Sequence, residues 1–295
     1  TGNSGTNPAT QFIGTSDNQS LRFKVNNIWA GELHPTNGNA FFGINAGKSN
    51  VTGALNVSIG KAALSNNTGG SNNVSIGDSS LYSFNGNATL GANTAIGTHT
   101  LYSSTASNSN TAIGGYAMYR NVDGGFNTSI GLNSLSNNIS GDSNTAIGTR
   151  ALQFNTASQN TATGASALRF NSLGANNTAN GFEYLYSNTS GINNSSFGIS
   201  SMHENSTGSY NTAVGSYVLH NQTVGRDNVA IGISAMGNSL AASENVAIGN
   251  YALFNQYFSN GGFSFISANT AIGFNALANN SPTDIFSGVY NTAIG

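Results

Sequence analysis

The chain has 295 residues, and only 18 of them are charged (8 Lys and Arg, 10 Asp and Glu), which gives a formal net charge of −2. The charged fraction is 6%, against roughly 25% in a typical soluble domain. The basic residues are scattered from Arg22 to Arg226, so a surface that tracks the phosphates of a nucleic acid is not expected. The absence of cysteine excludes disulfides and thiolate metal sites. No apolar run approaches the roughly 20 residues that span a bilayer, so we expect no membrane insertion.

Residues 1–38 differ in composition from the rest of the chain and contain its only tryptophan, Trp29. The stretch "SLRFKVNN" (20–27) alternates apolar with charged or polar side chains, which predicts a β-strand with one apolar face. We expect this segment to form a small β cap or adaptor, because the open end of a stacked β-structure otherwise exposes unpaired strand edges. The chain begins without Met and ends within a motif, "YNTAIG", so we read it as a piece of a longer protein.

Residues 39–295 are built from one repeated motif. Its consensus is N-[TV]-[AS]-I-G-x-x-[AS]-L-x-x-N-x-x-G-x-x, and the usual step is 17 residues, with one step of 16 and longer steps of 20, 24 and 22. The first position is Asn and the fifth is Gly in all fifteen copies, while the fourth is Ile in ten. The copies begin at Asn39, Asn56, Asn73, Asn93, Asn110, Asn127, Asn144, Asn160, Asn177, Asn194, Asn211, Asn228, Asn245, Asn269 and Asn291.

This period predicts an all-β fold, a parallel β-solenoid or β-roll of about fifteen coils. Seventeen residues are too few for two packed helices, and Gly, Asn, Ser and Thr are poor helix formers. We expect "NTAIG" to form a first strand, the glycine to allow a sharp bend, "xxAL" to form a second strand and the remainder to turn back. Coils stacked at the strand spacing of about 4.8 Å would make a rod on the order of 70 Å long.

The recurring first asparagine predicts a structural ladder. Identical amides stacked in register can hydrogen-bond from coil to coil, and asparagine tolerates left-handed backbone at corners. A ligand-binding role is the less favoured alternative, because every other copy would still need a structural explanation. The ladder positions on which this prediction rests include Asn56, Asn73, Asn93, Asn110, Asn127 and Asn144.

The stretch "SNTAIGTRAL" (143–152) shows how the side chains should divide. Positions two and four of the motif point to one side of the strand and position three points to the other. We assign Ala146 to a close-packed face, Ile147 and Leu152 to the core and Gly148 to the bend, and leave residues 149–150 facing solvent. Both faces of the strand are restricted in size or polarity. One face should therefore pack against the coil interior and the other against a further layer or another chain. We favour a parallel homotrimer, with a monomeric solenoid as the alternative.

The motifs resemble a known group of proteins. "NAFFGINAG" (39–47), the "NTAIGxxAL" copies, "NTANGFEYL" (177–185) and the preceding "QFIGTSDNQSLRFKVNNIWAGEL" (11–33) are similar to the repeat region of bacterial and phage tail-fibre proteins, which often end in an intramolecular chaperone domain. More distantly, the coils resemble the β-roll heads of trimeric autotransporter adhesins. The resemblance implies an extracellular, trimeric fibre on a cell, virion or injection-particle surface that mediates adhesion. It implies no catalytic residue and no cofactor in this chain.

Enzymatic chemistry is not expected. The four histidines occupy unrelated repeat positions without metal-ligand spacing. His203 and Glu204 are adjacent, and adjacent side chains on a strand would point to opposite faces. Asp227 and Glu244 occupy position seventeen of successive copies and are the closest approach to the carboxylate pair of a glycan-degrading tail spike, a minor alternative. The turns offer Asn and Ser where a calcium-binding repeat needs Asp, so no metal site is predicted.

Three inserts break the period and are expected to bulge from the rod: residues 84–92, 254–268 and 278–290. The second insert is aromatic, which suits stacking on sugar rings or docking to a protein receptor. The alternative is that its rings fold over the core of a neighbouring chain. The candidate receptor-contact residues are Phe254, Tyr257, Phe258, Phe263 and Phe265.

The main rival function is ice binding. Position two of the motif is Thr in nine of fifteen copies, and a flat, exposed ladder of threonines on a β-solenoid can order water. Val, Ala or Ser interrupts this ladder in the other six copies, which favours an inward or interface position for it. An exposed threonine face in the structure would support ice binding, and a buried one would exclude it.

Overall fold

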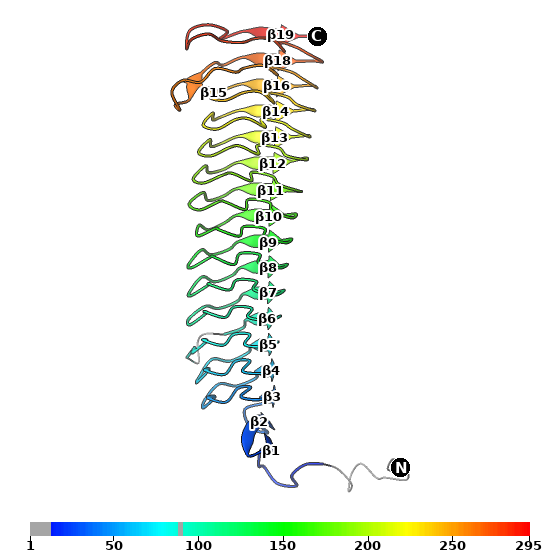
Figure 1. Ribbon diagram of the computed structural model, residues 1–295, viewed down its shortest axis with the longest axis vertical. Coiled ribbons are helices and arrows are strands. Elements are labelled where there is room, and N and C mark those ends of the chain that lie inside the picture. Colours follow the sequence, from blue (N-terminus) through cyan, green and yellow to red (C-terminus); the bar gives the residue numbers. More distant parts are fainter. Residues whose placement is uncertain (1–12, 88–90) are drawn as a thin grey trace, which may run out of the picture.

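The computed structural model describes residues 13–87 and 91–295, and these form one elongated solenoid in which short strands stack like rungs (Figure 1). Within the described residues, seventeen strands belong to one sheet and two form a separate pair. The strands of the main sheet are β1 (Leu21–Val25), β2 (Ile28–Leu33), β3 (Ala40–Phe42), β4 (Val57–Ile59), β5 (Val74–Ile76), β6 (Thr94–Ile96), β7 (Thr111–Ile113), β8 (Thr128–Ile130), β9 (Thr145–Ile147), β10 (Thr161–Thr163), β11 (Thr178–Asn180), β12 (Ser195–Phe197), β13 (Thr212–Val214), β14 (Val229–Ile231), β16 (Val246–Ile248), β18 (Thr270–Ile272) and β19 (Thr292–Ile294). The separate pair is β15 (Ala242–Ser243) with β17 (Phe265–Ile266).

From β3 onward the strands of the main sheet are parallel and keep the motif in register. In β8 and β9, for example, Thr128 pairs with Thr145, and Ile130 pairs with Ile147. The fold is therefore the predicted all-β, parallel β-solenoid, with a spacing near 17 residues and one strand of the main sheet in each copy of the motif. The longer steps are those that carry the inserts.

The glycine at position five ends each strand and cannot carry a side chain. Gly148 has a φ of +132°, and a Cβ placed on it would lie 2.5 Å from the carbonyl oxygen of Gly164 in the next coil. The same close approach recurs from coil to coil, so the invariance of this glycine follows from both its backbone angle and the stacking distance.

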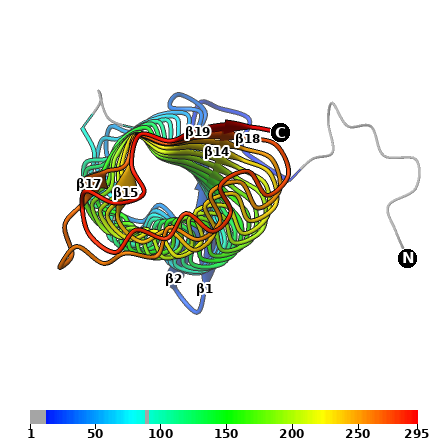
Figure 2. The same ribbon diagram turned by 90° about the horizontal axis from the view of Figure 1, so that it is seen from above.

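The predicted second strand is wrong, because the residues after the glycine form turns. Positions seven and nine adopt left-handed backbone, with φ values of +60° at Arg150 and +50° at Leu152. Alternating left-handed residues curl the chain, and an extended strand cannot contain them. Coil-to-coil hydrogen bonding continues nevertheless, for example from Leu152 N–H to the Ala167 carbonyl at 3.0 Å. Seen along the axis, the coils superpose as a closed ring (Figure 2).

The predicted asparagine ladder is present and buried. The backbone N–H of Asn144 donates to Asn127 Oδ1 at 2.8 Å, and its side-chain Nδ2 donates to the same oxygen at 3.1 Å. Nδ2 also donates to the Ala157 carbonyl across the coil at 2.9 Å. Each asparagine therefore links neighbouring coils and closes its own coil.

A second amide ladder, which the sequence analysis did not predict, occupies position twelve. Asn138 Nδ2 donates to Asn121 Oδ1 one coil earlier at 2.8 Å and to the Gly141 carbonyl in its own coil at 2.9 Å. Both asparagines are fully buried. The consensus Asn at position twelve could have predicted this ladder, because its partner within the coil is the consensus glycine three residues later.

The core of the coil consists of small and leucine side chains, and the assignment of Ile147 to it was wrong. Ala146, Ala151 and Leu152 are fully buried, whereas Ile147 is 40% exposed. Position three points into the coil, where it is Ala or Ser in every copy except the first, which has the buried Phe41. Positions two and four consequently point outward.

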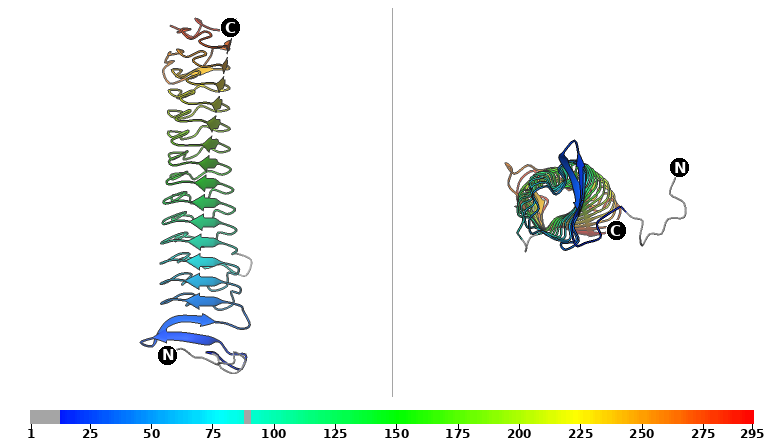
Figure 3. Two further views of the ribbon diagram at one scale, coloured as in Figure 1. Left: turned by 90° about the vertical axis from the view of Figure 1, so that its right-hand side faces the viewer. Right: turned by 90° about the horizontal axis from the view of Figure 1, so that it is seen from below.

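A β-hairpin covers the N-terminal end of the solenoid. Strand β1 pairs antiparallel with β2, and β2 pairs antiparallel with β3, so the edge of the first coil is not left open (Figure 3). Glu32 and Phe41 face each other across β2 and β3 and are both buried, and Arg22 Nε donates to Glu32 Oε2 at 2.9 Å. Residues 1–12 of the expected cap lie outside the described part of the chain.

Candidate interaction surfaces

The first candidate surface, the apolar face, is the outer side of the main sheet. It consists of the side chains at positions two and four of the motif. Most side chains at position two are half-buried. Most of those at position four, from Phe42 to Ile272, are 36–43% exposed. The face continues onto the hairpin, where the Phe23 and Phe42 rings lie 5.4 Å apart and Leu33 is 38% exposed. Nothing in the described chain covers it. A stripe of Thr, Val and Ile thus runs along the whole sheet.

The second candidate surface is a set of aromatic columns at the turn that follows each leucine. Tyr82, Tyr102 and Tyr119 stack with centroid distances of 5.2 and 5.3 Å and interplanar angles of 7° and 19°. Parallel stacking covers the ring faces and leaves their edges to solvent. A sugar stacks on a ring face, so these columns join coils to one another and do not offer a platform for a glycan.

A longer aromatic column runs along the rod over five successive coils in its middle part. Its rings succeed one another at 5.0–5.3 Å, and the guanidinium of Arg169 lies 5.0 Å from the Phe170 centroid. Arg169 also donates to Gln153 Oε1 at 2.9 Å and to the Tyr186 hydroxyl at 3.2 Å, so its charge is held against the column. The column rings are Phe154, Phe170, Tyr186, His203 and His220.

The structure divides the candidate receptor-contact residues of insert 254–268 into two groups. Phe265 lies in β17 and is 6% exposed, and Phe258 packs against it edge-to-face at 5.4 Å. Phe254 directly follows Leu253, at the motif position that the aromatic columns occupy in other coils, and its ring centroid lies 5.5 Å from that of Tyr251. Tyr257 and Phe263 are 58% and 74% exposed. Three of the five rings are therefore used for packing within the chain, and two face solvent.

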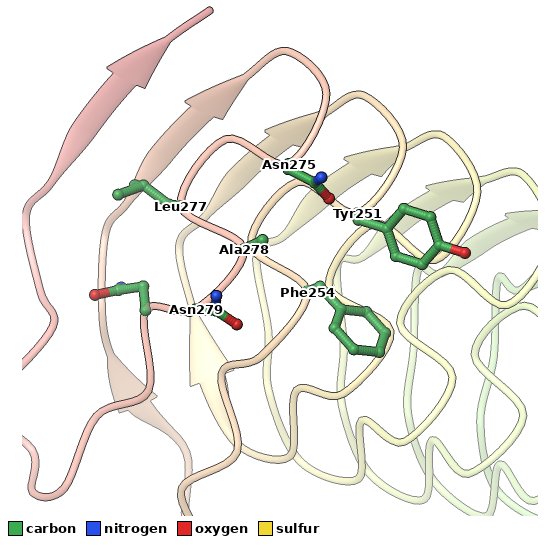
Figure 4. Close-up of a pocket in the computed structure, with 7 residues that line it drawn as sticks. Tyr251, Phe254, Asn275, Leu277, Ala278 and Asn279 are labelled. Carbon is green, nitrogen blue, oxygen red and sulfur yellow. The ribbon is translucent and has the colours of Figure 1, made fainter.

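Phe254 and Tyr251 also border a shallow hollow of about 600 Å³ beside the following coil. In Figure 4 the two rings stand at one side of this hollow, with Asn275 beside Tyr251 and with Ala278 and Asn279 across from the rings.

The other two inserts behave differently from each other. Phe84, at the start of insert 84–92, is fully buried and replaces the asparagine of the second ladder; residues 88–90 lie outside the described residues. Insert 278–290 carries Phe286 and Tyr290, which are 82% and 73% exposed.

The groups considered for catalysis lie in turns or bends of the coils. His203 Nδ1 lies 2.8 Å from Glu204 Oε1, contrary to the expected opposite orientation, because the two residues belong to a turn and not to a strand. Asp227 lies 3.8 Å from the Arg226 guanidinium, and both side chains are about half exposed. Among the described residues, no three His, Cys, Asp or Glu side chains cluster as metal ligands, and no helix has the length and apolarity needed to cross a membrane.

The chain matches no protein-family model, no curated protein and no solved structure. Its function has to be argued from its own surfaces.

Proposed function

We propose that this chain is part of a homotrimeric, extracellular adhesive fibre, in which three copies meet along their apolar faces and present their turns and inserts to a receptor or glycan. The apolar face carries the proposal. Its width of about 10 Å over a length of about 70 Å gives an area on the order of 700 Å², which is slightly above the roughly 300–600 Å² of the largest apolar patch on a typical monomer. That area is close to the roughly 800 Å² that one partner contributes to a standard interface.

The composition of this face fits self-association. Thr, Val and Ile repeat at the same two positions of successive strands, so identical faces from three parallel chains would meet in register around an axis. The other sides of each coil vary from copy to copy, as at position six of the motif, where Leu132, Thr149 and Phe182 are all exposed. The resemblance of the motifs to tail-fibre repeats and trimeric adhesin heads supports three chains over two.

The mass in solution tests this proposal. Multi-angle light scattering should give three times the 30.1 kDa of one chain. Replacing Ile130 and Ile147 by Lys would bury two charges per chain in the interface, so the double variant should run as a monomer or precipitate. The matched control places lysines at Ser140 and Thr149, which are exposed and lie off the apolar face, and should remain trimeric. A monomeric wild-type chain would rule out the trimer.

Ice binding is the second candidate, and one observation favours it. The threonines at position two point outward on a sheet of parallel strands in register, and most of them are partly exposed. Measuring thermal hysteresis of the wild-type chain tests it directly. The two proposals use the same face, so a trimer that buries this face and shows no hysteresis favours the fibre, whereas a monomer with hysteresis favours ice binding.

A further inference from the structure

The two C-terminal inserts meet in a hollow that is separate from both candidate surfaces described above. Residues 260–266 of insert 254–268 and residues 285–290 of insert 278–290 surround a volume of about 540 Å³, and we call this the insert hollow. Phe265 and Ile266 of β17 line it from one side, and Phe286 and Tyr290 line it from the other. Asn260 and Ser264 add an amide and a hydroxyl to its lining.

Two rings of the insert hollow differ from the rings of the aromatic columns. Phe286 and Tyr290 are the most exposed rings of the lining, at 82% and 73%, and neither contacts another aromatic ring among the described residues. Their faces are therefore available, whereas each column ring has at least one face covered by its neighbour. Aromatic rings with free faces beside amide and hydroxyl groups provide the two kinds of contact that a sugar ring needs.

Insert 278–290 is held in shape by its own hydrogen bonds. The Ser287 hydroxyl accepts from Thr283 N–H at 2.8 Å and from Asp284 N–H at 3.1 Å, and Phe286 N–H donates to Asp284 Oδ1 at 2.8 Å. At the end of the insert, the Asn280 amide donates to the Gly288 carbonyl at 2.8 Å. A loop that is ordered before binding loses less entropy when it binds, which suits a recognition site.

The lining of the insert hollow carries no charged side chain. A charged ligand would lose its hydration there without gaining an ion pair, whereas a neutral saccharide exchanges water for aromatic faces and neutral polar groups. The pair β15 and β17, next to the hollow, lies on the side of the coil away from β14 and β18 (Figure 2). The hollow therefore stays open when the apolar face is covered.

We propose that the insert hollow binds a neutral hexose unit of a cell-surface polysaccharide. This inference rests on the proposed adhesive function and names the ligand class and the place where it binds. It places the exposed sugar-contact rings at Phe286 and Tyr290 of insert 278–290, with Phe265 in the wall of the hollow, and leaves Phe254 and Phe258 to packing within the chain.

The test measures binding of three neutral hexasaccharides, namely maltohexaose, cellohexaose and mannohexaose, with sialyllactose as a charged comparison, by saturation-transfer NMR and titration calorimetry. We expect at least one neutral probe to bind, with affinity reduced at least fivefold in Phe286→Ala and in Tyr290→Ala and kept in Tyr290→Phe, which retains the ring. The control Tyr257→Ala removes an exposed ring that does not line the hollow and should leave the affinity unchanged.

Three results would overturn the proposal: binding of none of the neutral probes, binding that neither alanine variant weakens, or preferred binding of sialyllactose. Circular dichroism and the elution volume confirm that each variant keeps the wild-type fold. The light-scattering mass separates this inference from the fibre. A trimer that binds no neutral probe rejects the hollow alone, and a monomer that binds one through Phe286 rejects the trimer alone.

Discussion

Asn144 shows how much of the solenoid depends on single buried amides. Besides the three bonds that it donates, its Oδ1 accepts the backbone N–H of Asn160 in the next coil at 3.0 Å. The residue is 1% exposed, so water cannot replace these partners. Its amide therefore satisfies the backbone N–H of Asn160 in the next coil and, together with Asn155 Nδ2 at 2.6 Å, the Ala157 carbonyl of its own coil.

Replacing Asn144 by Ala should destabilise the protein by about 2 kcal/mol, because the Asn160 N–H would lose its buried partner at about 1–3 kcal/mol, whereas the Ala157 carbonyl keeps Asn155 Nδ2. Urea unfolding followed by circular dichroism measures the change. The matched control is Thr149→Ala, an exposed position of the same coil, which should change stability by less than about 0.5 kcal/mol. Equal unfolding midpoints for Asn144→Ala and the control would show that the ladder contributes little.

Tyr184 gives the chain a titratable group inside the coil. Burial raises its pKa above the usual 10.0, and a hydrogen bond with the backbone of Gly198 partly opposes this shift. A raised pKa in the folded state means that the protonated phenol stabilises the fold. That stabilisation is complete below pH 10.0, the unfolded value, and is lost as the pH rises through the higher folded value.

Tyr184→Phe tests this by removing the ionisable hydroxyl. Below pH 10 the variant should be less stable than the wild type by about 1 kcal/mol, the value of one hydrogen bond. Above pH 10 this difference in stability should shrink and then reverse. Only the wild type has a phenol here, which must either stay protonated at high pH or be buried as a phenolate, and both cost free energy. Urea midpoints of both proteins from pH 8 to 11 give the difference, in which the other tyrosines cancel. A difference independent of pH would contradict the assignment.

At the scale of the element, the first strand of each coil was predictable and the rest of the coil was not. The strict N-[TV]-[AS]-I-G pattern marks a strand and its bend, and β9 follows it residue by residue. Leu152 looked like a strand residue, yet it has left-handed backbone. Sequence propensity disfavours that conformation for leucine, and only the packing of neighbouring coils imposes it.

The direction of the strand faces was unpredictable for a related reason. Ile147 is larger and more apolar than Ala146, which favours it for a core when the coil width is unknown. Two buried amide ladders narrow the interior, and that is a property of the stacked coils, which one repeat does not reveal. The repeat pattern located both inserts that line the insert hollow. It did not show which of their rings pack within the chain and which face the hollow.

The aromatic columns join one turn to the next. Tyr82 and Tyr102 stack at 5.2 Å, and such a pair adds about 0.5–1.5 kcal/mol beyond the area it buries. A double-mutant cycle with Tyr82→Ala and Tyr102→Ala should give a coupling energy in that range by urea unfolding. The control cycle pairs Tyr82 with Tyr119, which are two coils or about 10 Å apart and should show additive effects. Coupling of the same size in both cycles would mean that the columns do not act through direct stacking.

At the scale of the whole molecule, the solenoid is a one-dimensional stack. In the main sheet of the described chain, every strand from β3 to β18 makes its principal contacts with the strand before it and the strand after it. Stability is then approximately a sum of coil and interface contributions, so damage to one interface should weaken its neighbours first. Amides near the middle should be the best protected from hydrogen exchange, and those of β19, which pairs only with β18, should be among the least.

Gly148→Ala tests this behaviour at the centre of the rod. The new Cβ would meet the Gly164 carbonyl, so the variant must separate the two coils or strain the backbone, at a cost of about 1–3 kcal/mol. Hydrogen exchange followed by mass spectrometry should then show loss of protection centred on β9 and β10, with the outer coils close to wild type. The control Gly261→Ala also places a side chain at positive φ, +58°, but in open space, and should leave the profile of the stack unchanged. Uniform loss over all coils in Gly148→Ala would show that the rod unfolds as a single unit, and nearest-neighbour contacts would then be too strong for the coils to act separately.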